Sequence, residues 1–189
     1  MAASETAEAR PAGNRRLRLG AVVAVAVAVA FIAWLLFIKG DDNSSKGRKA
    51  IPVAATAQSL RQLSSSLGHS VYWVGRRAGN TYELTRTSDG SVYVRYLPPG
   101  VALGDSRPNF LTIGTYPHPN ATATVQKAAR RQGALRLKVK GGLAVSNGTR
   151  PQSTYVAYSK DPNLLLEIFD PSPSRSHRLA SSGQVVPVR

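Results

Sequence analysis

The chain has 189 residues, and its 25 Lys and Arg against 10 Asp and Glu give a formal net charge of +15. It contains no cysteine, which excludes disulfides, thiolate metal sites, a cysteine nucleophile and a cysteine-linked lipid anchor. So basic a chain attracts anionic surfaces and polymers.

The first element is an apolar segment over residues 19–38, which has no charged or strongly polar side chain. Its first half alternates Val and Ala, but both faces of a strand would then be apolar, which is not the pattern of a half-buried strand. As a helix the segment rises about 30 Å, the thickness of the hydrocarbon core of a bilayer. Arg15, Arg16 and Arg18 precede it and Lys39 follows it. The sequence predicts one transmembrane helix over 19–38.

A cleaved signal peptide is the main alternative for this segment, and a buried core helix is a weaker one. The small-x-small pairs lie inside the apolar run, and no polar, small-residue cleavage region follows it. The Arg15–Arg16 pair resembles a twin-arginine export signal, but Arg18 stands where such signals carry an apolar residue. We therefore expect an uncleaved signal anchor.

The expected orientation of the membrane helix follows from the charges beside it and from the ease with which each side crosses the membrane. Lys and Arg are equally numerous on the two sides, but three of those on the N-terminal side lie within five residues of the helix. Long domains cross a membrane largely regardless of their charge. We expect a short basic cytoplasmic tail (1–18), the membrane helix, a flexible polar linker (39–50) and a basic domain outside the cytoplasmic membrane (51–189).

The domain over 51–189 carries 17 Lys and Arg against 6 Asp and Glu, a formal charge of +11. Anionic envelope polymers, lipid headgroups or an acidic protein would bind such a surface outside a cell. Nucleic acid becomes a candidate partner only if the topology is inverted. The alternative without a function is a basic surface that only contacts solvent and binds no ligand.

The first half of the domain begins with a helical pattern over 57–67, in which apolar residues share one face and Gly68 ends the helix. Three strands follow in an expected antiparallel meander, and Asp89–Gly90 predicts the hairpin between the second and the third. A loop leads to a fourth strand. The expected strands are 70–74, 81–87, 91–97 and 110–116.

The second half begins with a helix after Asn120, the expected N-cap, which ends near Gly133. A strand over 135–140 then alternates apolar and cationic side chains. The glycines of "KGGLAVSNG" indicate a bend or bulge. Two strands, a short helix with Asp170 as its cap and a closing edge strand complete the domain; we expect them at 153–158, 163–169, 171–183 and 184–188.

This order of elements predicts an α+β fold, mostly an antiparallel sheet with two or three helices packed on one face, preceded by the transmembrane helix. The strands do not alternate one by one with helices, which argues against a doubly wound parallel fold.

No catalytic, cofactor-binding or metal-binding residue is predicted. The three histidines, His69, His118 and His177, show no metal-ligand spacing, and no nucleophile-elbow or phosphate-loop motif occurs. Glu83 and Glu167 lie in strands and could in principle converge as an acid/base pair.

The remaining feature is a basic face shared by the second helix and the strand that follows it. Few residues join the two elements, so their cations are expected to form one patch for an anionic ligand or partner; alternatively, these cations only solvate two amphipathic elements. The candidate residues are Lys127, Arg130, Arg131, Arg136, Lys138 and Lys140.

The sequence thus favours a single-pass membrane protein that presents a basic domain for binding or scaffolding in the cell envelope, with no cofactor. Two alternatives stay open. One is a membrane-tethered enzyme whose site comes from distant residues. The other is an inverted topology, with a cytoplasmic domain that binds nucleic acid or the inner leaflet.

Overall fold

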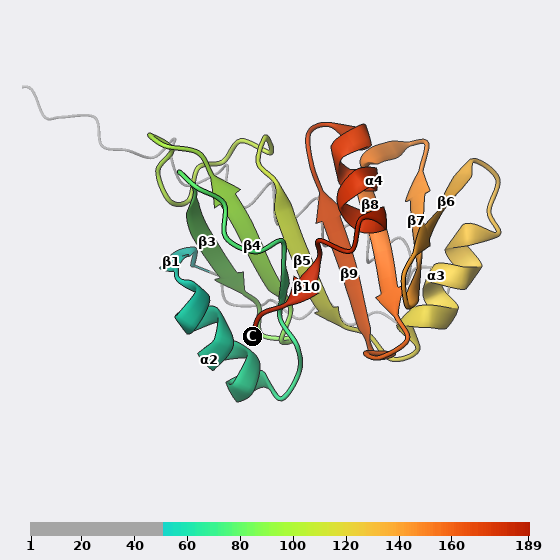
Figure 1. Ribbon diagram of the computed structural model, residues 1–189, viewed down its shortest axis with the longest axis horizontal. Coiled ribbons are helices and arrows are strands. Elements are labelled where there is room, and N and C mark those ends of the chain that lie inside the picture. The colour runs from blue at the N-terminus through green and yellow to red at the C-terminus, as the bar shows by residue number, and fades with distance from the viewer. Residues whose placement is uncertain (1–50) are drawn as a thin grey trace, which may run out of the picture.

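A computed structural model describes residues 51–189, which form three helices and ten strands (Figure 1). In chain order the elements are β1 (Val53–Ala55), α2 (Ala57–Leu67), β2 (Tyr72–Trp73), β3 (Thr81–Arg86), β4 (Val92–Leu97), β5 (Thr112–Pro117), α3 (Ala121–Ala129), β6 (Ala134–Val139), β7 (Gly142–Asn147), β8 (Arg150–Tyr158), β9 (Leu164–Phe169), α4 (Pro173–Ser181) and β10 (Val186–Pro187).

Eight strands form one antiparallel sheet in the order β1-β3-β4-β5-β9-β8-β7-β6. The chain reaches the middle of the sheet at β5, crosses to the far edge through α3, and returns to the middle through β6, β7, β8 and β9 (Figure 1). This confirms the predicted α+β fold with a large antiparallel sheet. β6 therefore lies at an edge, although it comes from the middle of the chain.

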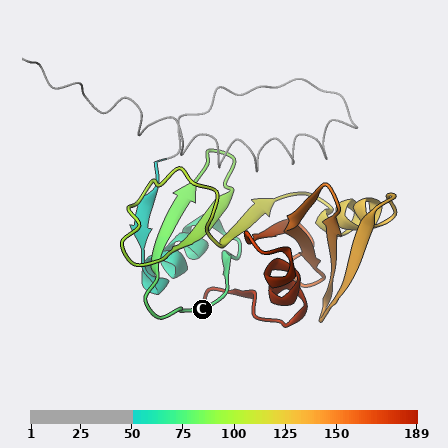
Figure 2. The ribbon, with the colours of Figure 1, turned by 90° about the horizontal axis from the view of Figure 1, so that it is seen from above.

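Helices pack on both faces of the sheet, so the expectation of helices on one face is wrong. On one face, Leu60 of α2 and Leu179 of α4 join a core with Leu166. On the other face, Val125 of α3 packs in a second core that includes Leu165. Successive residues of a strand point to opposite faces, so α3 lies opposite α2 and α4 (Figure 2).

Local chemistry explains the ends of α2. The Thr56 side chain accepts a hydrogen bond from the backbone N–H of Ser59, and the Ser59 hydroxyl accepts one from the N–H of Thr56, which is a capping box. Gly68 ends the helix in the left-handed conformation at φ 68°, as predicted. The β3–β4 hairpin predicted from Asp89–Gly90 is also present.

The expected caps of the other two helices differ in the structure. Asn120 precedes α3, but it has φ 59° and its side chain makes no capping hydrogen bond. The helix ends at Ala129, before Gly133. The N-cap of α4 is Ser172, because Asp170 instead accepts hydrogen bonds from the Ser172 N–H and from Arg175.

Three strand predictions were incomplete. β2 pairs with β10 rather than joining the meander, because its residues lie over the sheet in the α2 and α4 core. β1 was not predicted. The predicted bend after the basic strand is present as the turn at Lys140–Gly141, where Gly141 has φ 72°. The rest of the glycine-containing segment forms the unpredicted strand β7, and Gly142 fits there because a Cβ would lie 2.5 Å from the carbonyl oxygen of Ala157.

Within residues 51–189 no helix is long and apolar enough to cross a membrane. The predicted transmembrane helix at 19–38, with the tail and the linker, lies outside the described residues.

Candidate functional site

The six predicted basic residues lie at one end of the sheet, on α3, on β6 and at the turns after them (Figure 1). We call this region the cationic end, defined by Lys127, Arg130, Arg131, Arg136, Lys138 and Lys140. Its position is fixed by α3, whose apolar side is buried through Ala121, Val125 and Ala129. The opposite side of the helix carries Lys127 and is exposed.

Arg136 joins the two elements of the cationic end. Arg136 and Lys138 pair with Val145 and Leu143 across the β6–β7 ladder, and these partners belong to or pack against the core that holds α3. Cross-strand partners share a face of the sheet. The Arg136 Nε donates a 2.6 Å hydrogen bond to the carbonyl oxygen of Ala129 in the last turn of α3, where a cation interacts favourably with the helix dipole.

The other members differ in exposure. Lys127, Arg130, Lys138 and Lys140 are exposed, whereas Arg131 is half-buried. Arg131 lines a small cleft between α3 and the sheet, together with Gln132 and Val145. The structure thus exposes five of the six cations at one end of the sheet; Arg136 is one of these five and also holds the strand to the helix.

Charge is strongly segregated in this part of the fold. Residues 106–160 contain no Asp or Glu and nine Lys or Arg. Within residues 51–189, ion pairs join Glu83 to Arg95, Asp105 to Arg107 and Asp170 to Arg175. The exposed members of the cationic end take part in none of these three pairs: Lys127, Arg130, Arg136, Lys138 and Lys140. This segregation is visible in the sequence, but only the fold shows that the part of the stretch with α3, β6 and β7 forms one end of the sheet.

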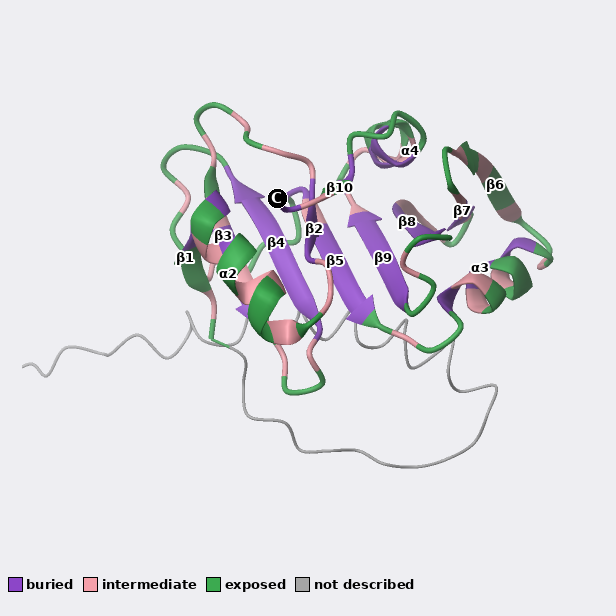
Figure 3. Cartoon of the chain, turned by 60° about the horizontal axis from the view of Figure 1, so that its bottom comes forward, coloured by how far each residue is buried: buried purple, intermediate pink, exposed green. Residues whose placement is uncertain are grey.

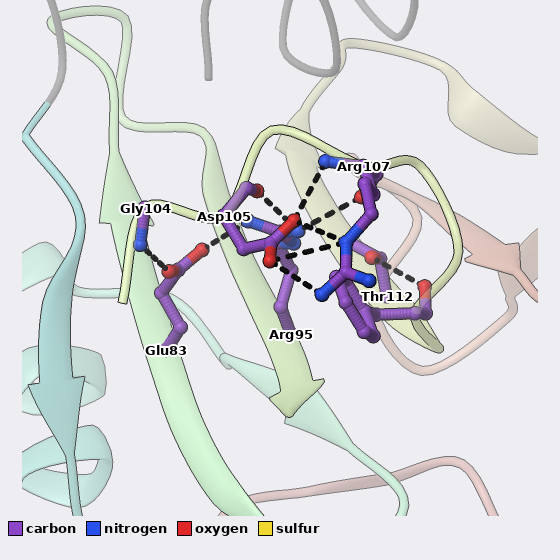
Figure 4. A network of polar contacts seen from close by, with 7 residues as sticks. Glu83, Arg95, Gly104, Asp105, Arg107 and Thr112 are labelled. Atoms are coloured by element: carbon purple, nitrogen blue, oxygen red, sulfur yellow. Dashed lines mark hydrogen bonds and ion pairs between the residues drawn. The ribbon is translucent and has the colours of Figure 1, made fainter. Parts of the chain in front are cut away.

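Glu83 is buried in a polar network under the long loop between β4 and β5 (Figure 4). Its carboxylate accepts a 2.6 Å hydrogen bond from Arg95 and another from the backbone N–H of Gly104. Arg95 also donates to the carbonyl oxygens of Asp105 and Arg107, at 2.9 and 3.2 Å. The ion pair therefore holds the loop against the sheet.

Glu167 of β9 is buried on the same face of the sheet as Glu83. It accepts hydrogen bonds from the hydroxyls of Tyr116, Ser153 and Tyr155 at 2.6, 2.7 and 2.9 Å. Burial, with the nearby Glu167 charge, raises the pKa of the Tyr116 and Tyr155 hydroxyls well above the ordinary value. Both tyrosines therefore stay protonated and serve as donors.

The two glutamates do not form an acid/base pair. Glu83 pairs with Arg95, Arg95 with Thr112 and Thr112 with Phe169, so three strand spacings separate Glu83 from β9. At about 4.8 Å per spacing the strands that carry the two glutamates lie about 14 Å apart, and each carboxylate is held by its own donors.

The histidines are dispersed. His118 bonds to Thr124 at 2.8 Å, and burial lowers its pKa. His177 lies on α4. His69 lines an open groove of about 620 Å³ with Lys160 and Asp161. In the part of the chain that the structure describes, no group of three His, Cys, Asp or Glu side chains could hold a metal ion.

The groove beside His69 has its polar groups largely engaged. Asp161 accepts a hydrogen bond from the Tyr72 hydroxyl. The Lys160 ammonium lies over the stacked rings of Tyr72 and Tyr158, at 5.5 and 5.8 Å from their centroids. His69 Nδ1 contacts the carbonyl oxygen of Ser70. His69 Nε2 is buried and has no hydrogen-bond partner among the described residues, so no hydroxyl of the groove is paired with this base.

No protein-family model, curated protein or solved structure matches the chain.

The chemistry available at the cationic end is electrostatic. Exposed Lys and Arg side chains without nearby carboxylates attract phosphate and carboxylate groups. The described carboxylates all accept hydrogen bonds from the domain itself: Glu83, Asp89, Asp105, Asp161, Glu167 and Asp170. The arrangement is suited to binding anions.

Proposed function

We propose that this protein is a single-pass membrane protein that presents the domain over residues 51–189 outside the cytoplasmic membrane and binds an anionic partner of the cell envelope there. The cationic end is the binding surface. The observation that carries the proposal is charge segregation: the exposed cations of α3 and β6 have no described carboxylate to neutralise them, while every described carboxylate is engaged elsewhere.

The predicted membrane helix supports the proposal because it would keep the domain close to the membrane surface. The linker at 39–50 is polar and contains glycine and serine, and such a segment spans about 20 Å as a flexible coil. The domain therefore stays close to the membrane, where anionic headgroups and polymers are concentrated.

Topology is tested first, by protease treatment of intact cells stripped of their outer layers, with a tag at the C-terminus. We expect digestion of a full-length, membrane-bound species. Protection of the tag would overturn the proposed orientation and favour a cytoplasmic domain that binds nucleic acid or the inner leaflet.

Binding is tested with the full-length protein in nanodiscs of neutral lipid and a fluorescent poly-glutamate probe. The triple variant Lys127→Glu, Lys138→Glu and Lys140→Glu changes exposed cations whose side chains form no ion pair or hydrogen bond within residues 51–189. We expect the affinity of this variant for the probe to fall at least about tenfold. Binding of the probe by the wild type should weaken as the NaCl concentration rises from about 50 to about 500 mM.

The matched control is Arg61→Glu, Arg76→Glu and Arg86→Glu, which changes the formal charge equally at exposed positions of α2, of the segment after β2 and of β3. The proposal requires this control to bind the probe nearly as the wild type does. An equal loss in both triples would mean that only net charge matters, and the cationic end would not be a site.

A further inference from the structure

β6 is the last strand of the sheet, and β7 is its only partner among the described strands. The two strands are joined by the tight turn Lys140–Gly141, closed by the pair Val139 and Gly142. The outer side of β6 is therefore an unpaired strand edge, and Figure 3 shows β6 as exposed and half-buried throughout, unlike the buried central strands.

The register shows which backbone groups of β6 point away from β7. Gly148 N–H donates to the Gly133 carbonyl oxygen at 3.4 Å, just outside the pair Ala134 and Asn147. That bond marks Ala134–Asn147 as a pair without direct hydrogen bonds, and antiparallel ladders alternate between the two kinds of pair. It follows that Leu135, Leu137 and Val139 bond to β7. Arg136 and Lys138 direct their N–H and C=O groups outward.

The side chains of β6 form two different rows beside this edge. Arg136 and Lys138 lie on the α3 face, two residues apart, and Lys140 follows at the turn. On the other face Leu135 is 48% exposed, and Leu137 and Val139 pack partly against the core. A strand added to this edge would meet cations on one face and apolar side chains on the other.

We infer that the free edge of β6 binds an acidic, extended polypeptide segment as a ninth strand, with acidic side chains at every second residue and apolar side chains between them. This inference rests on the proposed function and names its partner. Backbone hydrogen bonds to Arg136 and Lys138 supply affinity, and the alternating side chains supply specificity, as in other cases of strand addition.

Charge complementarity selects this occupant over a second copy of the chain. If β6 paired antiparallel with β6 of another copy, Arg136 and Lys138 would face the same cations, and like charges directly opposite each other in a sheet are destabilising. Lys on an edge strand is a common way to prevent such self-pairing. An acidic strand reverses the sign of that interaction.

The test uses the full-length protein in neutral-lipid nanodiscs and four fluorescent peptides with blocked ends and the same charge. The first is GEVEVEG, which alternates acidic and apolar residues. The second is GEEEVVG, which keeps the composition without the alternation. The third is GEVEVEG with its two valine nitrogens methylated, and the fourth is GEVEVEG with its three glutamate nitrogens methylated. When the glutamates face Arg136 and Lys138, the glutamate N–H groups donate to β6 in an antiparallel strand and the valine N–H groups donate in a parallel strand. One of the two methylated peptides therefore lacks the required donors in either orientation.

We expect GEVEVEG to bind at least about fivefold more tightly than GEEEVVG and than one of the methylated peptides, because each lost backbone hydrogen bond weakens binding severalfold. On the protein side, Lys138→Glu should weaken the binding of GEVEVEG about tenfold. The matched control, Arg86→Glu, changes an exposed residue of β3 near the other end of the sheet and should weaken this binding less than about threefold.

The outcomes separate this inference from the proposed function. If all the peptides and poly-glutamate bind with the same affinity per charge, the cationic end is an electrostatic surface and strand addition is wrong, while the proposed function stands. If the protein binds phosphatidylglycerol vesicles but no peptide, the partner is a lipid surface and the inference is overturned. Binding to none of these probes would overturn both.

Discussion

Glu83 and Arg95 lie directly opposite each other on β3 and β4, and their side chains form a buried ion pair of 2.6 Å. The Arg95 guanidinium also lies 5.1 Å from the centroid of the Phe110 ring. The pair is therefore covered by the same loop that it holds in place (Figure 4).

Removing only one member of this pair leaves an uncompensated buried charge. We expect Glu83→Gln to lower the free energy of unfolding by about 3–5 kcal/mol and to release the loop over residues 98–111 to proteolysis. Chemical denaturation and limited proteolysis measure these effects. The double variant Glu83→Met with Arg95→Met should recover much of the loss, and a double variant as unstable as the single one would contradict this account.

Gly114 explains how Tyr116 reaches Glu167 on the neighbouring strand. Gly114 is the cross-strand partner of Glu167, and a Cβ on Gly114 would lie 2.5–2.9 Å from the Tyr116 hydroxyl and ring. Gly114→Ala should lower the free energy of unfolding by about 1–3 kcal/mol, because the buried ring has to move.

The matched control for this substitution is Gly148→Ala, where the nearest atom to a new Cβ is 3.8 Å away. Its effect should stay within about 0.5 kcal/mol. Equal destabilisation by both substitutions, measured by thermal unfolding, would show that the contact with Tyr116 does not matter.

Glu167 is the shared acceptor for three hydroxyls, so the loss of stability on replacing it depends on how many acceptor oxygens the new side chain keeps. Glu167→Leu leaves the hydroxyls of Tyr116, Ser153 and Tyr155 without this partner, and we expect a loss of at least about 3 kcal/mol in the free energy of unfolding. Glu167→Gln keeps one acceptor oxygen and should lose about half as much. The order of the two variants in denaturant midpoint is the check: Gln no better than Leu would rule out hydrogen bonding as the main role.

Asp105 gives a pH-dependent prediction. The hydrogen bonds from the Arg107 side chain, and then from its backbone N–H, lower the pKa of Asp105 to about 2 from the ordinary 3.8. A carboxyl with a lowered folded-state pKa stabilises the fold above pH 3.8, and this contribution disappears as the pH falls towards 2.

Carbon NMR of the Asp105 carboxyl checks the value directly. The titration midpoint should be about 2 in the wild type and should move towards 3.8 in Arg107→Ala. Asp89 offers an internal comparison: burial raises its pKa, but hydrogen bonds from Thr87 and Ser91 outweigh burial and lower it. Its midpoint should therefore not respond to Arg107→Ala.

The sequence by itself determined the elements whose signals are local. Gly68 ends α2, Asp89–Gly90 sets the β3–β4 hairpin, and the alternation after Ala134 marks β6 as a strand with one cationic row. The cations of the candidate site were also readable, because a helix face and a strand face each follow from residue periodicity.

The tertiary structure decided which elements become neighbours. Periodicity tells which side chains share a face, but not which strand lies beside which, because ladder pairing joins segments that are far apart in the chain. Only the strand order puts β6 at an edge, sends β2 to β10 and gives each face of the sheet its own helices. The sequence shows Glu83 and Glu167 only as two glutamates in strands, whereas the strand order separates them by three strand spacings. Glu83 pairs with Arg95, and Glu167 accepts hydrogen bonds from three hydroxyls.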